Sequence, residues 1–174
     1  MSDEVQLLPD PVWTDRFERE RERVLSALDG VCSVTVSHVG STAIPGVPGE
    51  PALDVLVVVD LPSTVPEAVA ALADAGYERE HVAEHEAVLL RRLDEGPRVL
   101  KLHRPGDDKV ENQLLFRDYL RDDADARRRY VRAKREAVAE HGGDREAYTA
   151  AKTDVVGELL DEARAADGSS PESS

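Results

Sequence analysis

The chain has 174 residues, of which 41% are hydrophobic, and its 36 acidic and 22 basic side chains give a formal charge of −14. An apolar content this high excludes an intrinsically disordered chain, and the length suits one domain. The negative charge repels nucleic acid and anionic membranes, so neither is expected as a partner unless the fold builds a local basic pocket.

The composition also bears on the setting in which the protein works. Only four of the basic residues are lysines, which together with the many carboxylates resembles a surface adapted to high salt; an ordinary acidic cytosolic protein is the alternative. The chain has a single cysteine, Cys32, so it forms no internal disulfide, as is typical of proteins in a reducing compartment. Cys32 lies in an apolar stretch and is expected to be a buried hydrophobic residue rather than a nucleophile. Acidic residues follow Met1, unlike a signal peptide, and the longest apolar run, 55–59, is too short to span a membrane. We therefore expect a cytoplasmic protein with no membrane partner.

The first elements are predicted to be a helix and two strands. The helix carries its apolar residues near helical spacing, at Trp13, Phe17, Val24 and Leu28. Gly30 ends it, and apolar, β-branched runs at 31–39 and 52–59 then predict two strands. The loop between them, 40–51, holds three glycines and three prolines. The second strand is apolar on both faces, which is typical of a central strand.

A second helix and three further strands are expected next. Thr64 and Glu67 form a capping box with a proline in the first turn, and predict a helix to Ala75 that Gly76 closes. Three short strands follow, at about 77–83, 86–93 and 98–104. The Glu-Gly-Pro turn at 95–97 predicts that the last two form an antiparallel hairpin.

The remainder is predicted to be helical, with a short tail. Helices are expected at about 113–121, 123–140 and 144–166. Asp144 suits the N-cap of the last helix, and the acidic run at 122–125 would interact favourably with a helix dipole. The low-complexity tail, 167–174, is expected to be disordered.

This order of elements predicts an α+β fold. We expect one domain over 1–166, with a mixed or antiparallel sheet of about five strands and a helical C-terminal third at 113–166.

The Gly40-Ser41 turn and Asp54 carry the first chemical signal. A glycine just after a strand lets the backbone approach a ligand, and a serine beside it adds N–H and hydroxyl groups for phosphate oxygens. Asp54 lies at the start of the next strand, and pairing the two strands as a hairpin would bring it to the turn. A phosphate grip beside a carboxylate is the minimum for binding a nucleotide through a divalent ion.

Several blocks of the sequence together resemble the GrpB family, also called UPF0157. They are Trp13 with Phe17, HVGSTAIPG at 38–46, PALDVL at 51–56, FRDYLR at 116–121, Tyr130 with Lys134, and YTAAKTD at 148–154. The resemblance covers about 9–165. The family is placed in the nucleotidyltransferase superfamily, so it implies a polymerase-β-like fold. It also implies that Gly40, Ser41 and Thr42 face the phosphates of a small-molecule nucleotide or phosphorylated substrate, and that Asp54 binds Mg²⁺ or Mn²⁺.

Two departures from the family pattern bear on catalysis. A two-metal transferase needs carboxylates at alternate positions of one strand, and the second position here is Leu56. Members usually carry a lysine before a proline, where this chain has Glu50 and Pro51.

Three hypotheses therefore stay open. The first is metal-dependent transfer of a nucleotidyl group from a nucleoside triphosphate to an unidentified acceptor. The second is binding of a nucleotide or phosphorylated metabolite without turnover. The third is a protein-interaction scaffold that keeps the loop motif for folding.

Residues on the later strands are candidates for the same site. His103 ends the last strand and would serve as a catalytic metal ligand or general base; a surface histidine is the alternative. Alternation places one of Arg91 and Arg92 in the concave face of the sheet, and Arg91 is our candidate for phosphate binding. A solvated pair is the alternative.

Residues on the C-terminal helices are candidates too. Lys134 and Lys152 each follow a tyrosine by four residues, so each shares a helix face with an aromatic ring. They would offset the charge of a bound polyphosphate, or else extend to water. Arg117 and Asp118 form either a structural salt bridge or part of the cleft lining.

Overall fold

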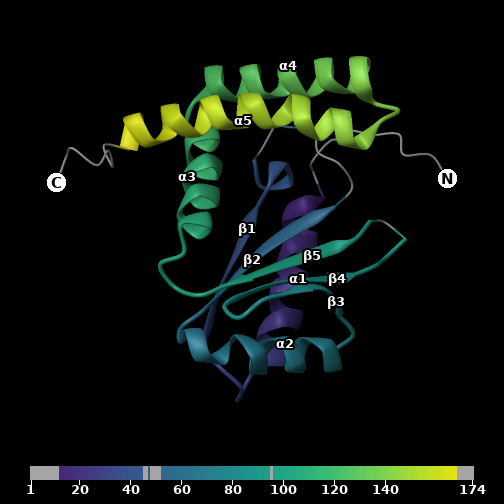
Figure 1. Ribbon diagram of the computed structural model, residues 1–174, viewed down its shortest axis with the longest axis vertical. Helices are drawn as coiled ribbons and strands as arrows, with labels where there is room; N and C mark the ends of the chain where they lie inside the picture. Colours follow the sequence, from purple (N-terminus) through teal and green to yellow (C-terminus); the bar gives the residue numbers. More distant parts are fainter. Residues whose placement is uncertain (1–11, 45–46, 48–51, 95, 168–174) are drawn as a thin grey trace.

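The computed structural model describes residues 12–44, 47, 52–94 and 96–167, so the expected tail lies outside the described residues from 168 onward. A sheet with two helices on one face makes up one part of the molecule, and three further helices make up the other (Figure 1). None of the described helices has the length and apolarity needed to cross a membrane.

Five strands form one mixed sheet. They are β1 (Val34–Val39), β2 (Leu53–Val59), β3 (Glu78–Val82), β4 (Glu86–Arg91) and β5 (Arg98–His103). The spatial order is β1-β2-β5-β4-β3, in which β2 and β5 run parallel and every other neighbouring pair is antiparallel. The predicted α+β class with a mixed five-stranded sheet is confirmed, and β2 is an interior strand as its apolar pattern indicated.

The helices are close to those predicted. They are α1 (Trp13–Leu28), α2 (Val65–Asp74), α3 (Asp108–Asp122), α4 (Ala124–His141) and α5 (Arg145–Asp167). The predicted cap at Asp144 is present, since its carboxylate accepts from the backbone N–H of Ala147, and Asp123 of the acidic run caps α4 in the same way through Ala126. Helix α3 begins about five residues before the predicted start because Asp107 caps it, accepting from the backbone N–H of Lys109 at 2.9 Å.

The predicted capping box at the start of α2 was wrong. The residue before the helix, Thr64, has a helical backbone conformation and no side-chain cap bond. Its hydroxyl instead donates to the carbonyl of Leu61 at 2.6 Å, which closes a short 3₁₀ turn, Pro62–Thr64. A capping side chain needs a non-helical backbone to reach back to the first turn, so the preceding 3₁₀ turn removes the box.

Two apolar cores hold the parts together. The larger lies between one face of the sheet and helices α1 and α2, and includes all four predicted stripe residues of α1 (Figure 1). The smaller lies among the C-terminal helices and takes in Ile44 and Val47 from the loop after β1, beside Leu120 and Tyr130. The loop that follows the Gly40-Ser41 turn is therefore anchored in the helical part.

Strand alternation assigns the side chains to faces. On β2, Leu53, Val55 and Val57 belong to the core under α1, so Asp54, Leu56 and Val58 point to the opposite face. On β5 the same alternation places Val99, Lys101 and His103 on the face of Asp54.

Candidate functional site

The turn after β1 is in direct contact with Asp54. Strands β1 and β2 pair as an antiparallel hairpin, which was the condition for Asp54 to reach the turn, with Val39 opposite Asp54. Gly40 has a φ of +79°, and a β-carbon placed on it would overlap Oδ2 of Asp54. Glycine is required here both by its left-handed backbone and by the space that the carboxylate occupies.

Two arginines of α3 hold the carbonyls on either side of this turn. Arg117 Nη1 donates to the carbonyl of His38 at 3.3 Å, and Arg121 Nε donates to that of Ala43 at 2.9 Å. Arg117 also forms an ion pair with Asp118, with Nη2 at 2.8 Å from Oδ1. The turn therefore has a fixed conformation, set by the helical part.

His38 and Thr42 form a buried pair under the turn, on the side of α1. The His38 ring stacks on Phe17 with centroids 4.8 Å apart, and its Nε2 lies 2.8 Å from the Thr42 hydroxyl. Burial, with Arg121 and Arg117 nearby, lowers the pKa of His38 from 6.5 to about 4. His38 is therefore neutral at pH 7, and the Thr42 hydroxyl is directed to it rather than to Asp54.

Lys101 lies beside Asp54 on the neighbouring parallel strand. Its Nζ is 3.8 Å from Asp54 Oδ1, and both side chains are about one-third exposed, at 34% and 27%. Sequence reasoning did not select Lys101. Because Lys101 lies two residues before His103, strand alternation places both side chains on the same face of the sheet. Lys101 reaches Asp54 through the parallel pairing of β2 with β5, and local sequence patterns do not predict a pairing between segments so far apart in the chain.

The surroundings of Asp54 do not fit a two-metal centre. Among the described residues, the positions that flank Asp54 on its own face are Val39, Leu56, Val99 and Lys101, and none is a carboxylate. Leu56, at the position of the second ligand, is fully buried. The ammonium of Lys101, 3.8 Å from Asp54 Oδ1, already places one positive charge beside this carboxylate.

His103 lies at the far end of the sheet from Asp54. Asp54 pairs with Val99, and His103 is four residues further along β5, about 13 Å at the usual rise per residue. His103 Nδ1 instead lies 3.1 Å from Asp107 Oδ2, and Glu86 completes a group whose donor atoms lie within 4.8 Å of one another. Lys109 Nζ lies 3.1 Å from both oxygens of Glu86 and neutralises it.

Arg91 points to the opposite face, under α1. Its Nη2 lies 2.5 Å from Oε1 of Glu20, which is 1% exposed. Glu20 also accepts from the hydroxyl of Tyr77, and Arg98 Nε lies 3.8 Å from Oε1. The bond to Glu20 raises the pKa of Arg91. Arg91 thus belongs to a buried ionic network behind the sheet, and Arg92 is exposed, with Nε 3.3 Å from Glu78.

Lys134 and Lys152 lie in the α4–α5 hairpin, each over the tyrosine predicted to share its face. The distances from Nζ to the ring centroids are 5.2 Å for Lys134 on Tyr130 and 5.4 Å for Lys152 on Tyr148. Lys134 is 1% exposed, so its ammonium is enclosed by protein. The structure does not place either lysine among the side chains that flank Asp54 on its face of the sheet.

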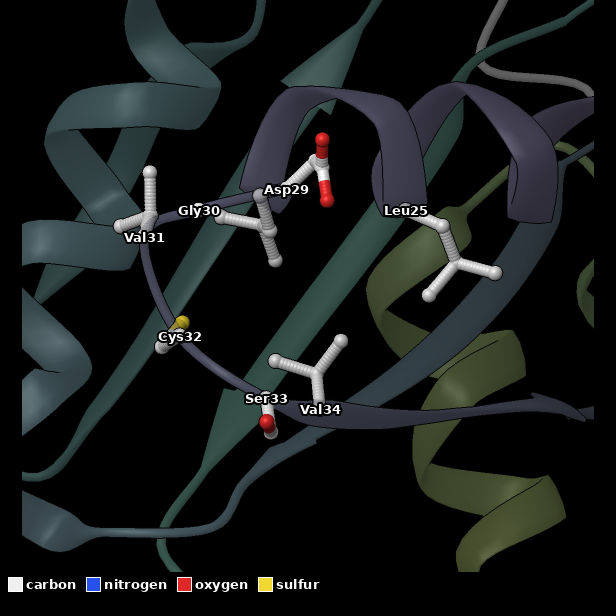
Figure 2. A pocket seen from close by; sticks show the side chains of 8 residues that line it. Leu25, Asp29, Gly30, Val31, Cys32, Ser33 and Val34 are labelled. Atoms are coloured by element: carbon white, nitrogen blue, oxygen red, sulfur yellow. The ribbon is translucent and has the colours of Figure 1, made fainter.

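A separate hollow of about 520 Å³ lies where α1 passes into β1 (Figure 2). Cys32 is part of its lining and also packs against the sheet core. Burial raises the pKa of this thiol, which keeps it protonated. Among the described residues, the lining carries one carboxylate, Asp29, and no basic side chain, so it does not suit an anionic ligand.

Comparison with known proteins agrees with this architecture. The family model described as GrpB protein matches residues 5–162. A UPF0157 protein of Pseudomonas aeruginosa is 32% identical over 169 residues, covering 94% of this chain and 69% of that protein. A UPF0157 protein of Streptomyces coelicolor is 36% identical over 147 residues, covering 84% and 77%. A dephospho-CoA kinase of Mycolicibacterium paratuberculosis is 31% identical over 174 residues, covering 83% of this chain but 42% of that protein.

Solved structures show the same fold. The GrpB protein of Enterococcus faecalis superposes with a TM-score of 0.74 at 22% identity, covering 91% of this chain and 98% of that one. The Cid1 poly(U) polymerase superposes with a TM-score of 0.54 at 14% identity, covering 75% and 43%. The chain therefore belongs to the GrpB family and has the α+β fold of the polymerase-β-like nucleotidyltransferases.

Proposed function

We propose that this protein binds the phosphates of a nucleotide, or of a phosphorylated metabolite, at the Gly40-Ser41 turn beside Asp54 and Lys101, without two-metal transfer. The observation that carries the proposal is the Lys101–Asp54 pair, at 3.8 Å, in which Asp54 also packs directly against Gly40 of the turn. A cation and backbone N–H groups are the donors that phosphate oxygens need.

Lys101 is able to change partner at little cost. Ion pairs between partly exposed groups contribute on the order of 1 kcal/mol or less, so exchanging Asp54 for a phosphate oxygen is a small step. Asp54 then positions the ammonium rather than a metal ion. This assignment explains why the chain has the Asp54 carboxylate but carries a buried leucine, Leu56, where a two-metal transferase has its second metal-binding carboxylate.

The relatives suggest which ligands to test. One neighbour is a poly(U) polymerase whose structure was solved with Mg and 3'-dATP, and one relative is named a dephospho-CoA kinase. Nucleoside triphosphates and dephospho-CoA are therefore the first probes for this chain.

Thermal unfolding with each probe tests the proposal. Wild type and Asp54→Ala are compared in molar KCl, with and without Mg²⁺ or Mn²⁺. A ligand at one hundred times its dissociation constant stabilises the folded state by about 2.7 kcal/mol, which raises Tm by several degrees. We expect that rise in wild type with or without the metal ion, and a larger one in Asp54→Ala, which lacks the carboxylate that competes with phosphate for Lys101. The absence of a shift with every probe would favour the scaffold hypothesis.

Nucleotidyl transfer is the second candidate function. It is favoured by the partly exposed Asp54 beside the intact turn, in a fold shared with Cid1. Release of pyrophosphate from a nucleoside triphosphate, dependent on Mg²⁺ or Mn²⁺ and abolished by Asp54→Asn, would establish transfer in place of simple binding. We expect no such release, because the flanking positions supply no second carboxylate among the described residues.

A further inference from the structure

A second hollow lies on the other side of the turn, between α1, β1 and α3. Its volume is about 360 Å³, at the small end of the range for ligand pockets. Its apolar lining comes from Phe17, Val36 and Ala43, and its polar lining includes Thr42, Arg117 and Arg121. Asp54 and Lys101 are not part of this lining.

The hollow is cationic in a chain whose net charge is −14. Arg117 and Arg121 stand one turn apart on α3, and each uses one N–H to hold a carbonyl of the β1 loop. Burial, and after it the positive charge of Arg117, lower the pKa of Arg121. Among the described residues, Glu18 is the one carboxylate in the lining, and Asp118 accepts from both Nε and Nη2 of Arg117.

We propose that this hollow binds a small phosphorylated molecule, with the phosphate on the Nη groups of Arg121 and on the N–H groups of Arg117 that remain beside its bonds to Asp118 and His38, and with the carbon skeleton against Phe17 and Val36. Guanidinium groups bind phosphate through paired, charge-assisted hydrogen bonds, and the Arg121 Nη atoms lie beyond the Nε that Ala43 engages. His38 is neutral at pH 7 and adds no repulsion or attraction of its own.

A ligand in this hollow would meet the same turn that contacts Asp54. The two carbonyls that the arginines hold, those of His38 and Ala43, flank Gly40 and Ser41. This site is separate from the one proposed above, because its cations are Arg117 and Arg121 rather than Lys101. The two proposals therefore fail or succeed independently.

Titration calorimetry with inorganic phosphate and with glycerol 3-phosphate, at pH 7.5 in chloride buffer, tests this site. In wild type this hollow should take one molecule of either probe per chain, in addition to any that the Lys101 site binds. Arg121→Gln should weaken binding about tenfold or more, since it removes a charge-assisted donor pair. Glu18→Gln should strengthen binding, because it removes the only carboxylate of the lining. The gain expected of Glu18→Gln keeps the test decisive even where Arg121→Gln disturbs the loop.

Matched controls separate this site from general charge effects. Arg92→Gln removes an exposed arginine elsewhere, and Lys101→Gln removes the cation of the other proposed site. Both should leave the affinity for the two probes unchanged. The proposal is overturned if neither probe binds, if Arg121→Gln and Glu18→Gln bind as wild type does, or if the controls lose affinity as much as Arg121→Gln.

Discussion

Gly40 and Asp54 are in contact so close that a single added carbon at Gly40 would overlap the Asp54 carboxylate. The turn and the carboxylate thus form one unit, and substitution at Gly40 combines a steric overlap with an unfavourable φ of +79°. We expect Gly40→Ala to cost about 2–4 kcal/mol, about 1–2 from the backbone and the rest from overpacking. Urea unfolding measures this loss.

Gly106 provides the control for that substitution. Its φ is +80°, but nothing lies within 4 Å of an added β-carbon, so Gly106→Ala should show the backbone cost alone. The double variant Gly40→Ala, Asp54→Ala has no carboxylate to overlap with the added β-carbon. It should therefore recover the part of the stability loss that the overlap causes. Equal losses for Gly40→Ala and Gly106→Ala would show that the contact with Asp54 has no energetic weight.

The ionic network behind the sheet is expected to stabilise the fold rather than to bind ligand. Glu20→Ala leaves Arg91 and Arg98 without their shared buried partner, and breaking a buried pair in this way costs about 3–5 kcal/mol. Chemical unfolding measures the loss. Glu78→Ala, which removes an exposed partner of Arg92, should cost less than about 1 kcal/mol. A comparable effect of the two substitutions would contradict this assignment.

His38 makes stability depend on pH in a predictable direction. Between pH 6.5 and about 4 the unfolded chain binds a proton at His38 that the folded chain does not, so stability falls as the pH decreases. The full difference is about 3 kcal/mol from this group. His38→Gln should therefore lose less stability than wild type between pH 7 and 4, as measured by denaturant unfolding at each pH. Parallel curves for the two proteins would contradict it.

Much of the fold was predictable because local patterns determine it. The spacing of Trp13, Phe17, Val24 and Leu28 gave α1 and its buried face, and the two-sided apolar run gave β2 as an interior strand. The antiparallel pairing of β1 with β2, on which the approach of Asp54 to the turn depended, is present in the structure. Local periodicity and turn residues carry this information within a few residues of each element.

The composition of the site depended on contacts that the sequence does not encode locally. The parallel pairing of β2 with β5 brings Lys101 to Asp54 and moves His103 to the opposite end. Strand alternation predicted that the side chains of Arg91 and Arg92 point to opposite faces of the sheet. It did not predict which of the two faces α1 covers.

Titration calorimetry of nucleotides tests the central claim most directly. Wild type and Lys101→Gln are titrated with ATP, GTP, CTP, UTP and dephospho-CoA in molar KCl. The account predicts that at least one probe binds wild type with one molecule per chain, and that Lys101→Gln weakens its binding about tenfold or more because a charged donor is lost. Equal affinity in the two proteins, or no binding of any probe, would contradict a phosphate site at Lys101 and Asp54.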